Sequence, residues 1–162
     1  MAANTGRTTS KWITFNVDDS AGTLRAIPIN SISVVGVVYD EQDVTAFQDA
    51  VKNALPNMPD APIEISGPFD NTAAAAAPAL SGSHTVLSGI NGVSTTPLAL
   101  GVKFGIRHDW ESGEPVFGIT GSPANGYLCV SYTVNPNDMT YTAKFVCYPG
   151  SAIPAWGTTA IT

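Results

Sequence analysis

One short segment holds most of the side chains in this sequence that could do chemistry. Residues 105–115 read "GIRHDWESGEP" and bring together an arginine, a histidine, an aspartate, a tryptophan and two glutamates. A histidine beside carboxylates can transfer protons, because its ordinary pKa lies close to neutral pH. The residues to consider as a proton-transfer group are Arg107, His108, Asp109, Glu111 and Glu114.

Catalysis needs further partners, and the sequence does not offer them. No G-x-S-x-G nucleophile motif occurs, and the other histidine, His84, lies in a segment rich in glycine and serine. The two histidines and two cysteines lack the close spacing of zinc ligands, and no glycine-rich phosphate loop follows a strand. We therefore expect a protein that is not an enzyme and that uses no cofactor or metal.

Charge is sparse along the whole chain. Only 12% of the 162 residues are charged, against about 25% in ordinary domains. Extensive subunit contacts would explain such a surface, and so would a neutral surface rich in serine and threonine. The net charge is −6 and the seven basic residues are scattered in the sequence, which argues against specific nucleic-acid binding. No apolar run is long enough to span a membrane.

The charged segment is expected to connect two strands. In residues 98–107, apolar side chains alternate with small or basic ones, which is the period of a β-strand. The run "PVFGITG" (115–121) follows as its partner. Further strands are predicted at residues 11–19, at 31–40 with a possible bulge at Gly36, and at 61–69.

One segment has a helical period instead. Val44, Phe47, Val51 and Leu55 recur at helical spacing, between a possible N-cap at Asp43 and the helix-breaking Pro56. We predict a flanking helix over 43–55, whereas residues 85–90 fit either a helix or a strand. The fold class is therefore all-β, with about eight strands and one flanking helix.

A hairpin is predicted over residues 127–148, around an Asn-Pro-Asn-Asp turn. A register that pairs Val134 with Met139 places one apolar set on a single face, namely Leu128, Val130, Tyr132, Tyr141, Ala143 and Phe145. In this register Cys129 and Cys147 lie on opposite faces, too far apart for a disulfide unless a bulge intervenes. We expect two reduced thiols.

The chain divides into an N-terminal arm (1–11), a domain (12–148) and an extended C-terminal tail (149–162). Residues 71–84, which include the alanine run 73–77, are predicted to form a surface excursion. Trp110 and Trp156 lie in segments without a strand pattern. Such a tryptophan either folds back on its own core or anchors in a neighbouring subunit, and the sequence leaves both possibilities open.

Four segments share, in order, the pattern of a known family. They are "SAGTLRAIPINSISVVG" (20–36), "DVTAFQDAVKNALPNMPDAPIEISGPFDNT" (43–72), "GEPVFGITG" (113–121) and the hairpin "GYLCVSYTV…YTAKFV" (126–146). Together they resemble phage major tail tube proteins. In that family a "GTLRDIS"-like strand leads to a short helix near "DVT", an A-x-x-x-I-S-G-x-[FY]-D strand follows, and a hairpin closes the domain. The resemblance covers roughly residues 12–148 and rests on the order and spacing of the motifs.

The resemblance implies two packed antiparallel sheets, as a β-sandwich or half-barrel. Six copies would form a ring, and stacked rings would form the tail tube of a virion assembled in the host cytoplasm. DNA would pass through the channel without specific binding, and a tape measure protein and tail-end proteins would be partners. The candidate inter-subunit contacts are Arg107, His108, Asp109, Trp110, Glu111 and Trp156. The alternative is a capsid-decorating or carbohydrate-binding β-sandwich, which would use the loop tryptophans.

Overall fold

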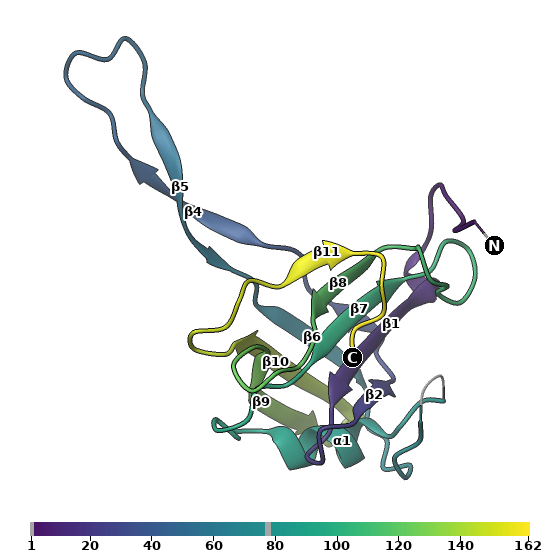
Figure 1. Cartoon of the computed structure of the whole chain (residues 1–162). Coiled ribbons are helices and arrows are strands. Elements are labelled where there is room, and N and C mark those ends of the chain that lie inside the picture. Colours follow the sequence, from purple (N-terminus) through teal and green to yellow (C-terminus); the bar gives the residue numbers. More distant parts are fainter. Residues whose placement is uncertain (1, 77–78) are drawn as a thin grey trace.

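Antiparallel sheets make up most of the structure. The computed structural model describes residues 2–76 and 79–162. Five strands form one sheet in the order β11-β8-β7-β1-β2, four form a second in the order β3-β6-β10-β9, and β4 and β5 pair only with each other (Figure 1). The predicted fold class, all-β with one helix, is confirmed. Ala77 and Pro78, in the expected surface excursion, lie outside the described residues, as does Met1 of the expected arm.

The elements follow one another along the chain with these bounds: 3-10 helix η1 Ser10–Trp12, β1 Ile13–Asp18, β2 Leu24–Ile27, β3 Ser31–Ile32, β4 Val38–Asp43, β5 Ala54–Asp60, β6 Ile63–Pro68, α1 Ser83–Ile90, β7 Leu100–Phe104, β8 Val116–Ile119, β9 Tyr127–Asn135, β10 Thr140–Cys147 and β11 Ala155–Gly157.

The core lies between the two larger sheets. Alternation along β1 turns Phe15 and Val17 inward, and alternation along β6 does the same for Ile63 and Ile65, both within segments that the sequence predicts as strands. The rings of Phe15 and Phe145, one from each sheet, lie 5.5 Å apart. One end of the core is closed by the apolar side of α1, which buries Val86, Leu87 and Ile90.

The helix predicted over residues 43–55 is wrong. This segment forms the end of β4, a turn and the start of β5. The turn is closed by Thr45, whose Oγ1 accepts from the Asn53 N–H at 2.8 Å, and by Asp49, which accepts from Asn53 Nδ2 at 2.9 Å. The α-helix of the described chain is α1, in the segment that the sequence left open.

The strand expected over 31–40 is also divided. Residues Ser31–Ile32 form β3 in the four-stranded sheet, and β4 begins at Val38 outside that sheet. Between them Gly36 has φ 145°, which favours glycine. The chain leaves the four-stranded sheet between these two strands, so Gly36 lies in a break between them and not in a bulge within one strand.

The closing hairpin has a different register from the predicted one. Tyr141 pairs with Val134 and Ala143 with Tyr132, two residues away from the expected partners, and this shift keeps those side chains on one face. A bulge between Lys144 and Phe145 then moves the register by one. As a result Cys129 is opposite Phe145 on the buried face and Val130 is exposed.

The bulge overturns the geometric argument about the cysteines. Cys147 pairs with Tyr127 and Cys129 with Phe145, so both cysteines lie on the core side of the hairpin. They are nevertheless free thiols, with Cys129 buried and Cys147 partly buried. Burial raises the pKa of Cys129 to about 11, so its thiol stays protonated at neutral pH.

The C-terminal tail is not simply extended, because it folds back on the five-stranded sheet. Residues Ala155–Gly157 form β11, which pairs with β8. Gly121 N–H donates to the carbonyl of Thr162 at 3.0 Å, and the side chain of Ile161 lies against Gly101. The tail thereby covers one edge of the sheet, which would otherwise expose unpaired backbone groups.

Candidate assembly interface

The charged loop, residues 105–115, joins β7 to β8 as the sequence predicts. The N-terminal segment lies across it. Thr8 Oγ1 donates to the carbonyl of Gly105 at 2.6 Å and accepts from the Arg107 N–H at 3.2 Å. Arg107 has φ 68° and its guanidinium donates to the carbonyl of Thr5 at 3.3 Å. The arm predicted over residues 1–11 therefore contacts its own chain.

A buried carboxylate organises the inside of the loop. Glu114 has no exposed surface, and its Oε2 accepts from the Glu111 N–H at 3.0 Å. Its Oε1 lies 2.9 Å from Nε2 of His108. Within the described chain, no donor is oriented to form a hydrogen bond with this oxygen. Asn4 Nδ2 also contacts the same histidine nitrogen. The pair is thus a short contact that holds the histidine ring beside the buried carboxylate.

The structure brings only part of the predicted proton-transfer group together. His108 and Glu114 meet, whereas Asp109 and Glu111 point to solvent on the surface of the loop. Among the described residues, no group of three or more His, Cys, Asp or Glu side chains could hold a metal ion. The contacts of Glu114 connect residues of one loop, and this arrangement fixes the loop's shape.

Both tryptophans contact their own chain, and neither is fully covered by it. Trp110 Nε1 donates to the carbonyl of Glu114 at 3.0 Å, and Lys103 Nζ lies 4.9 Å from the centre of the ring. Trp156 packs on Phe104 and Phe117, with ring centroids 5.4 and 5.1 Å away. Its side chain is still 55% exposed. Folding back and contacting a neighbour are therefore compatible for both residues.

Basic residues that are scattered in sequence gather beside the loop. Trp12 accepts a hydrogen bond from the Gly105 N–H at 3.0 Å, so residues 7–12 lie next to residues 103–107. This contact, with those of Thr8, brings Arg7, Lys11, Lys103 and Arg107 to one end of the molecule. Four of the seven basic residues are thus in one region, which spacing along the chain does not indicate.

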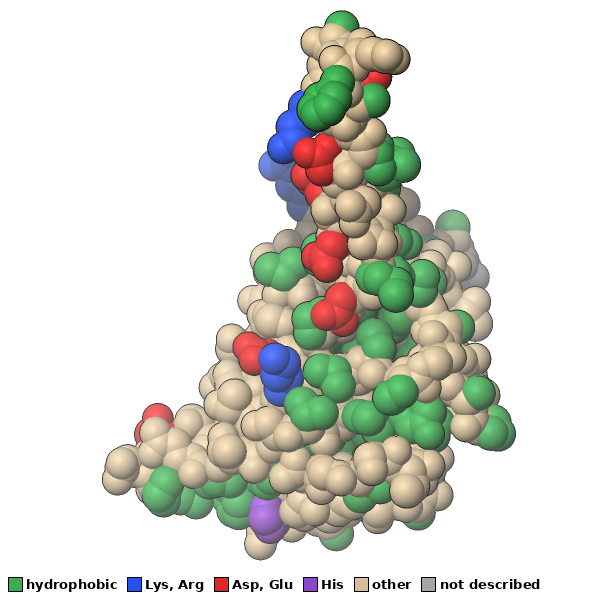
Figure 2. All heavy atoms as spheres, turned by 90° about the vertical axis from the view of Figure 1, so that its left-hand side faces the viewer, with side chains coloured by type: hydrophobic (Ala, Val, Ile, Leu, Met, Phe, Trp, Pro, Cys, Tyr) green, Lys and Arg blue, Asp and Glu red, His purple; other side chains and the backbone are tan. Residues whose placement is uncertain are grey.

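The projecting hairpin, residues 38–60, is the largest feature that the sequence did not predict. Strands β4 and β5 leave the body and make no pair with either larger sheet (Figure 1). Its exposed apolar side chains are Val38, Tyr39, Val44, Phe47, Val51, Leu55 and Met58, and Phe47 is exposed completely. Acidic side chains are interspersed with them along the hairpin (Figure 2). Pro56 and Pro59 were the available signal, since proline in a strand favours a free edge.

Comparison with known proteins gives no match by sequence: no family model matches the chain, and neither does any curated protein. The described part of the chain contains no helix that is both long and apolar enough to cross a membrane.

Solved structures do share the fold. The tube-terminating cap of the anti-feeding prophage (AFP) superposes with a TM-score of 0.59 at 9% identity, over 98% of this chain and 96% of that chain. The sheath/tube terminator of the extracellular contractile injection system PVC, in its extended state, gives 0.55 at 12% identity, over 96% and 99%. A chain of the PVC sheath-tube complex gives 0.54 at 10% identity, over 94% and 93%.

These similarities extend over nearly the full length of each chain. The fold is therefore that of chains found in the tube and tube-terminator assemblies of contractile injection systems. At 8 to 12% identity the likeness concerns the fold, and the residues at the contacts have to be argued from this chain itself.

Proposed function

We propose that this protein is a structural subunit of a tail tube, in which six copies form a ring and the rings stack around a channel. Its fold, shared with chains of assembled injection systems, supports a tail-associated structural role. The resemblance to phage major tail tube proteins supports the more specific role of tube subunit. A tape measure protein inside the tube and tail-end proteins are the expected partners.

The observation that carries the proposal is the projecting hairpin. A two-stranded hairpin alone in water is marginally stable at best, and this one exposes seven large apolar side chains away from the body. A feature of this kind is stabilised when another surface covers it. In an assembly of identical chains that surface belongs to a neighbouring copy.

The charge of the protein fits a channel for DNA. The net charge of −6 repels a polyanion, so a genome can move past without being held. We propose that the protein lies in the tail of a virion or a virion-like particle and that it has no enzymatic activity.

Carbohydrate binding remains the alternative function. A sugar-binding tryptophan offers an open ring face, and Trp156 keeps part of its ring exposed. Trp110 is less suitable, because its N–H is bonded to Glu114 and Lys103 lies over its ring. A glycan array with the Trp156→Ala variant as control tests this alternative directly.

The test of the proposed function is negative-stain electron microscopy from dilute to concentrated protein. We expect rings or striated tubes at high concentration. A variant with residues 44–53 replaced by a two-residue Asn-Gly turn should fold and remain dispersed, because Asp43 and Ala54 already pair across the hairpin. Wild-type protein that stays monomeric at the highest attainable concentration contradicts the proposal.

A further inference from the structure

A groove runs from the outer face of the five-stranded sheet, beside the charged loop, to β3 of the four-stranded sheet. Two adjoining hollows of about 660 and 470 Å³ share Lys11, Ile13 and Ile29 in their walls. The larger hollow continues along β1 and β2 to Trp110 of the charged loop on one side and to Leu80 on the other. We call this combined hollow the β1–β2 groove.

The walls of the groove combine apolar surface with positive charge. Ile13, Ile29 and Trp110 are each only partly covered by their own chain. Two lysines, Lys11 and Lys103, line the groove, against one carboxylate, Asp109. Among the described residues, no carboxylate forms an ion pair with Lys103, and burial lowers the pKa of its ammonium group. An incoming carboxylate would supply such a partner.

The projecting hairpin has the complementary character. Residues 38–60 contain five acids and one lysine, together with the seven exposed apolar side chains. Asp40 and Glu41 lie at the irregularity in β4, next to Val38 and Tyr39. Two apolar residues are thus followed by two acids on a short strand that pairs with β5 along one edge and with no strand of the larger sheets along the other. The acids of such a strand can face the two lysines of the groove, and its apolar side chains can cover the apolar wall between these lysines.

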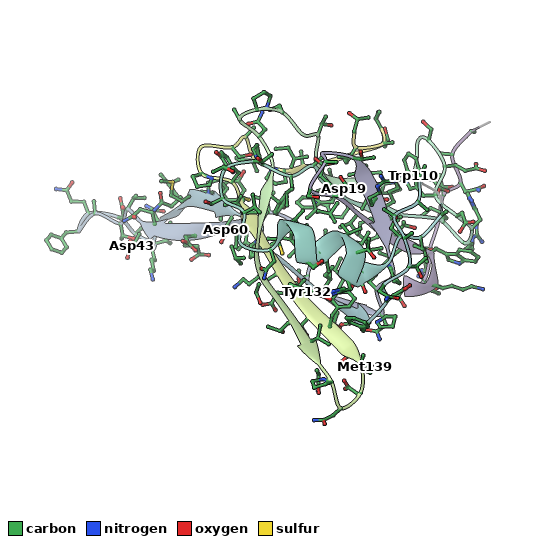
Figure 3. All side chains as sticks on the ribbon, turned by 90° about the horizontal axis from the view of Figure 1, so that it is seen from below. Asp19, Asp43, Asp60, Trp110, Tyr132 and Met139 are labelled. Atoms are coloured by element: carbon green, nitrogen blue, oxygen red, sulfur yellow. The ribbon has the colours of Figure 1, made fainter. Side chains whose placement is uncertain are left out.

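The Trp110 end of the groove and the projecting hairpin lie at opposite ends of the molecule. Figure 3 shows Asp43 of the hairpin at one end and Trp110 of the groove at the other, and Figure 1 shows the hairpin leaving the body on the side away from the N-terminal segment. The hairpin thus points away from the Trp110 end of its own groove and toward the space that a second copy would occupy. A contact between two different surfaces of identical chains is head-to-tail and can be repeated from copy to copy.

We propose that the β1–β2 groove binds the projecting hairpin of a second copy of this chain, with Lys11 and Lys103 facing acids of the hairpin. This inference rests on the proposed function, since it names the two surfaces that join neighbouring subunits. It assigns to Lys11 and Lys103, which sequence reasoning did not single out, the role of recognising the partner.

The experiment is a charge-reversal cycle read by sedimentation velocity. Lys11→Glu with Lys103→Glu on one surface, and Asp40→Lys with Glu41→Lys on the other, should each lower association by about tenfold or more. Mixing the two variants should restore association between them. The acidic hairpin of the groove variant then meets the unchanged basic groove of the hairpin variant, and the reversed, basic hairpin meets the reversed, acidic groove. The matched control is Asn137→Glu, an exposed position in the turn between β9 and β10 that lines neither the groove nor the hollow beside the hairpin, and it should associate like the wild type.

Folding and position are checked separately. Lys11 is exposed, so Lys11→Glu alone tests the groove if the Lys103 change unfolds the loop. A photoreactive benzoylphenylalanine at position 47 should cross-link to peptides from the groove, as read by mass spectrometry. Two outcomes overturn this inference and leave the tube proposal standing, provided that the wild-type protein assembles. In the first, both reversal variants assemble as well as the wild type; in the second, the cross-link falls on β9–β10. Wild-type protein that does not assemble overturns both.

Discussion

Two phenylalanines allow packing within the subunit to be separated from contact between subunits. Phe15 is completely buried between the sheets, whereas Phe47 is completely exposed near the tip of the projecting hairpin. Phe15→Ala should cost about 3–5 kcal/mol of unfolding free energy, because it leaves a cavity in the core. At about 2–4 °C per kcal/mol for a domain of this size, Tm should fall by about 6–20 °C.

Phe47→Ala should behave in the opposite way. In dilute protein it should change the free energy of unfolding by less than about 0.5 kcal/mol, since the side chain touches no core residue. If a neighbouring copy covers this ring, the lost burial is worth about 1.5–3 kcal/mol per contact. Association should then weaken by about 10- to 150-fold.

The assay combines urea unfolding of dilute protein, followed by tryptophan fluorescence, with light scattering of concentrated protein. The reasoning fails if Phe47→Ala destabilises dilute protein as much as Phe15→Ala does, because the hairpin would then pack on its own body. It fails equally if Phe47→Ala assembles like the wild type.

Three further predictions concern the subunit itself. Gly118→Ala should abolish folding, because the added Cβ would lie 2.0 Å from a carbonyl oxygen of β7. In Gly157→Ala on β11 the added Cβ meets no atom within 4 Å, so this control variant should fold. Circular dichroism of both variants checks the difference. Stability should fall as pH rises from 9 to 11: burial raises the pKa of Cys129 from 9.0 to about 11 and also raises that of Tyr127, so the unfolded chain loses these protons first. The urea midpoint should therefore decrease over that range, and less steeply in Cys129→Ala. Trp156→Ala should lower stability by about 1–2 kcal/mol through its lost contacts with two rings, and unchanged stability would show that β11 detaches in solution.

Sequence periodicity predicted those strands that are buried on one side. Along β1 and β6 the alternation of Phe15, Val17, Ile63 and Ile65 corresponds directly to inside and outside, because a packed sheet imposes a period of two. The same reasoning failed for residues 43–55. Their apolar residues face no core, so helical spacing carried no information about which face would be buried.

The candidate interface was predictable only in part. The position of the charged loop between two strands follows from the strands on either side, β7 and β8. The contact between Asn4 and His108 spans more than a hundred residues, and local spacing says nothing about such pairs. The gathering of Lys11 and Lys103 depends on the same long-range packing, so only the folded chain reveals it.

The bulge in the closing hairpin has a consequence for how related chains should be aligned. Lys144 pairs with Ser131 and Phe145 with Cys129, which leaves Val130 as an extra residue in β9. A chain lacking that residue would still turn Cys129 and Tyr132 toward the core, since the two halves of the strand would then continue in one register. Single-residue gaps, which usually belong in loops, should therefore be allowed at position 130 inside this strand.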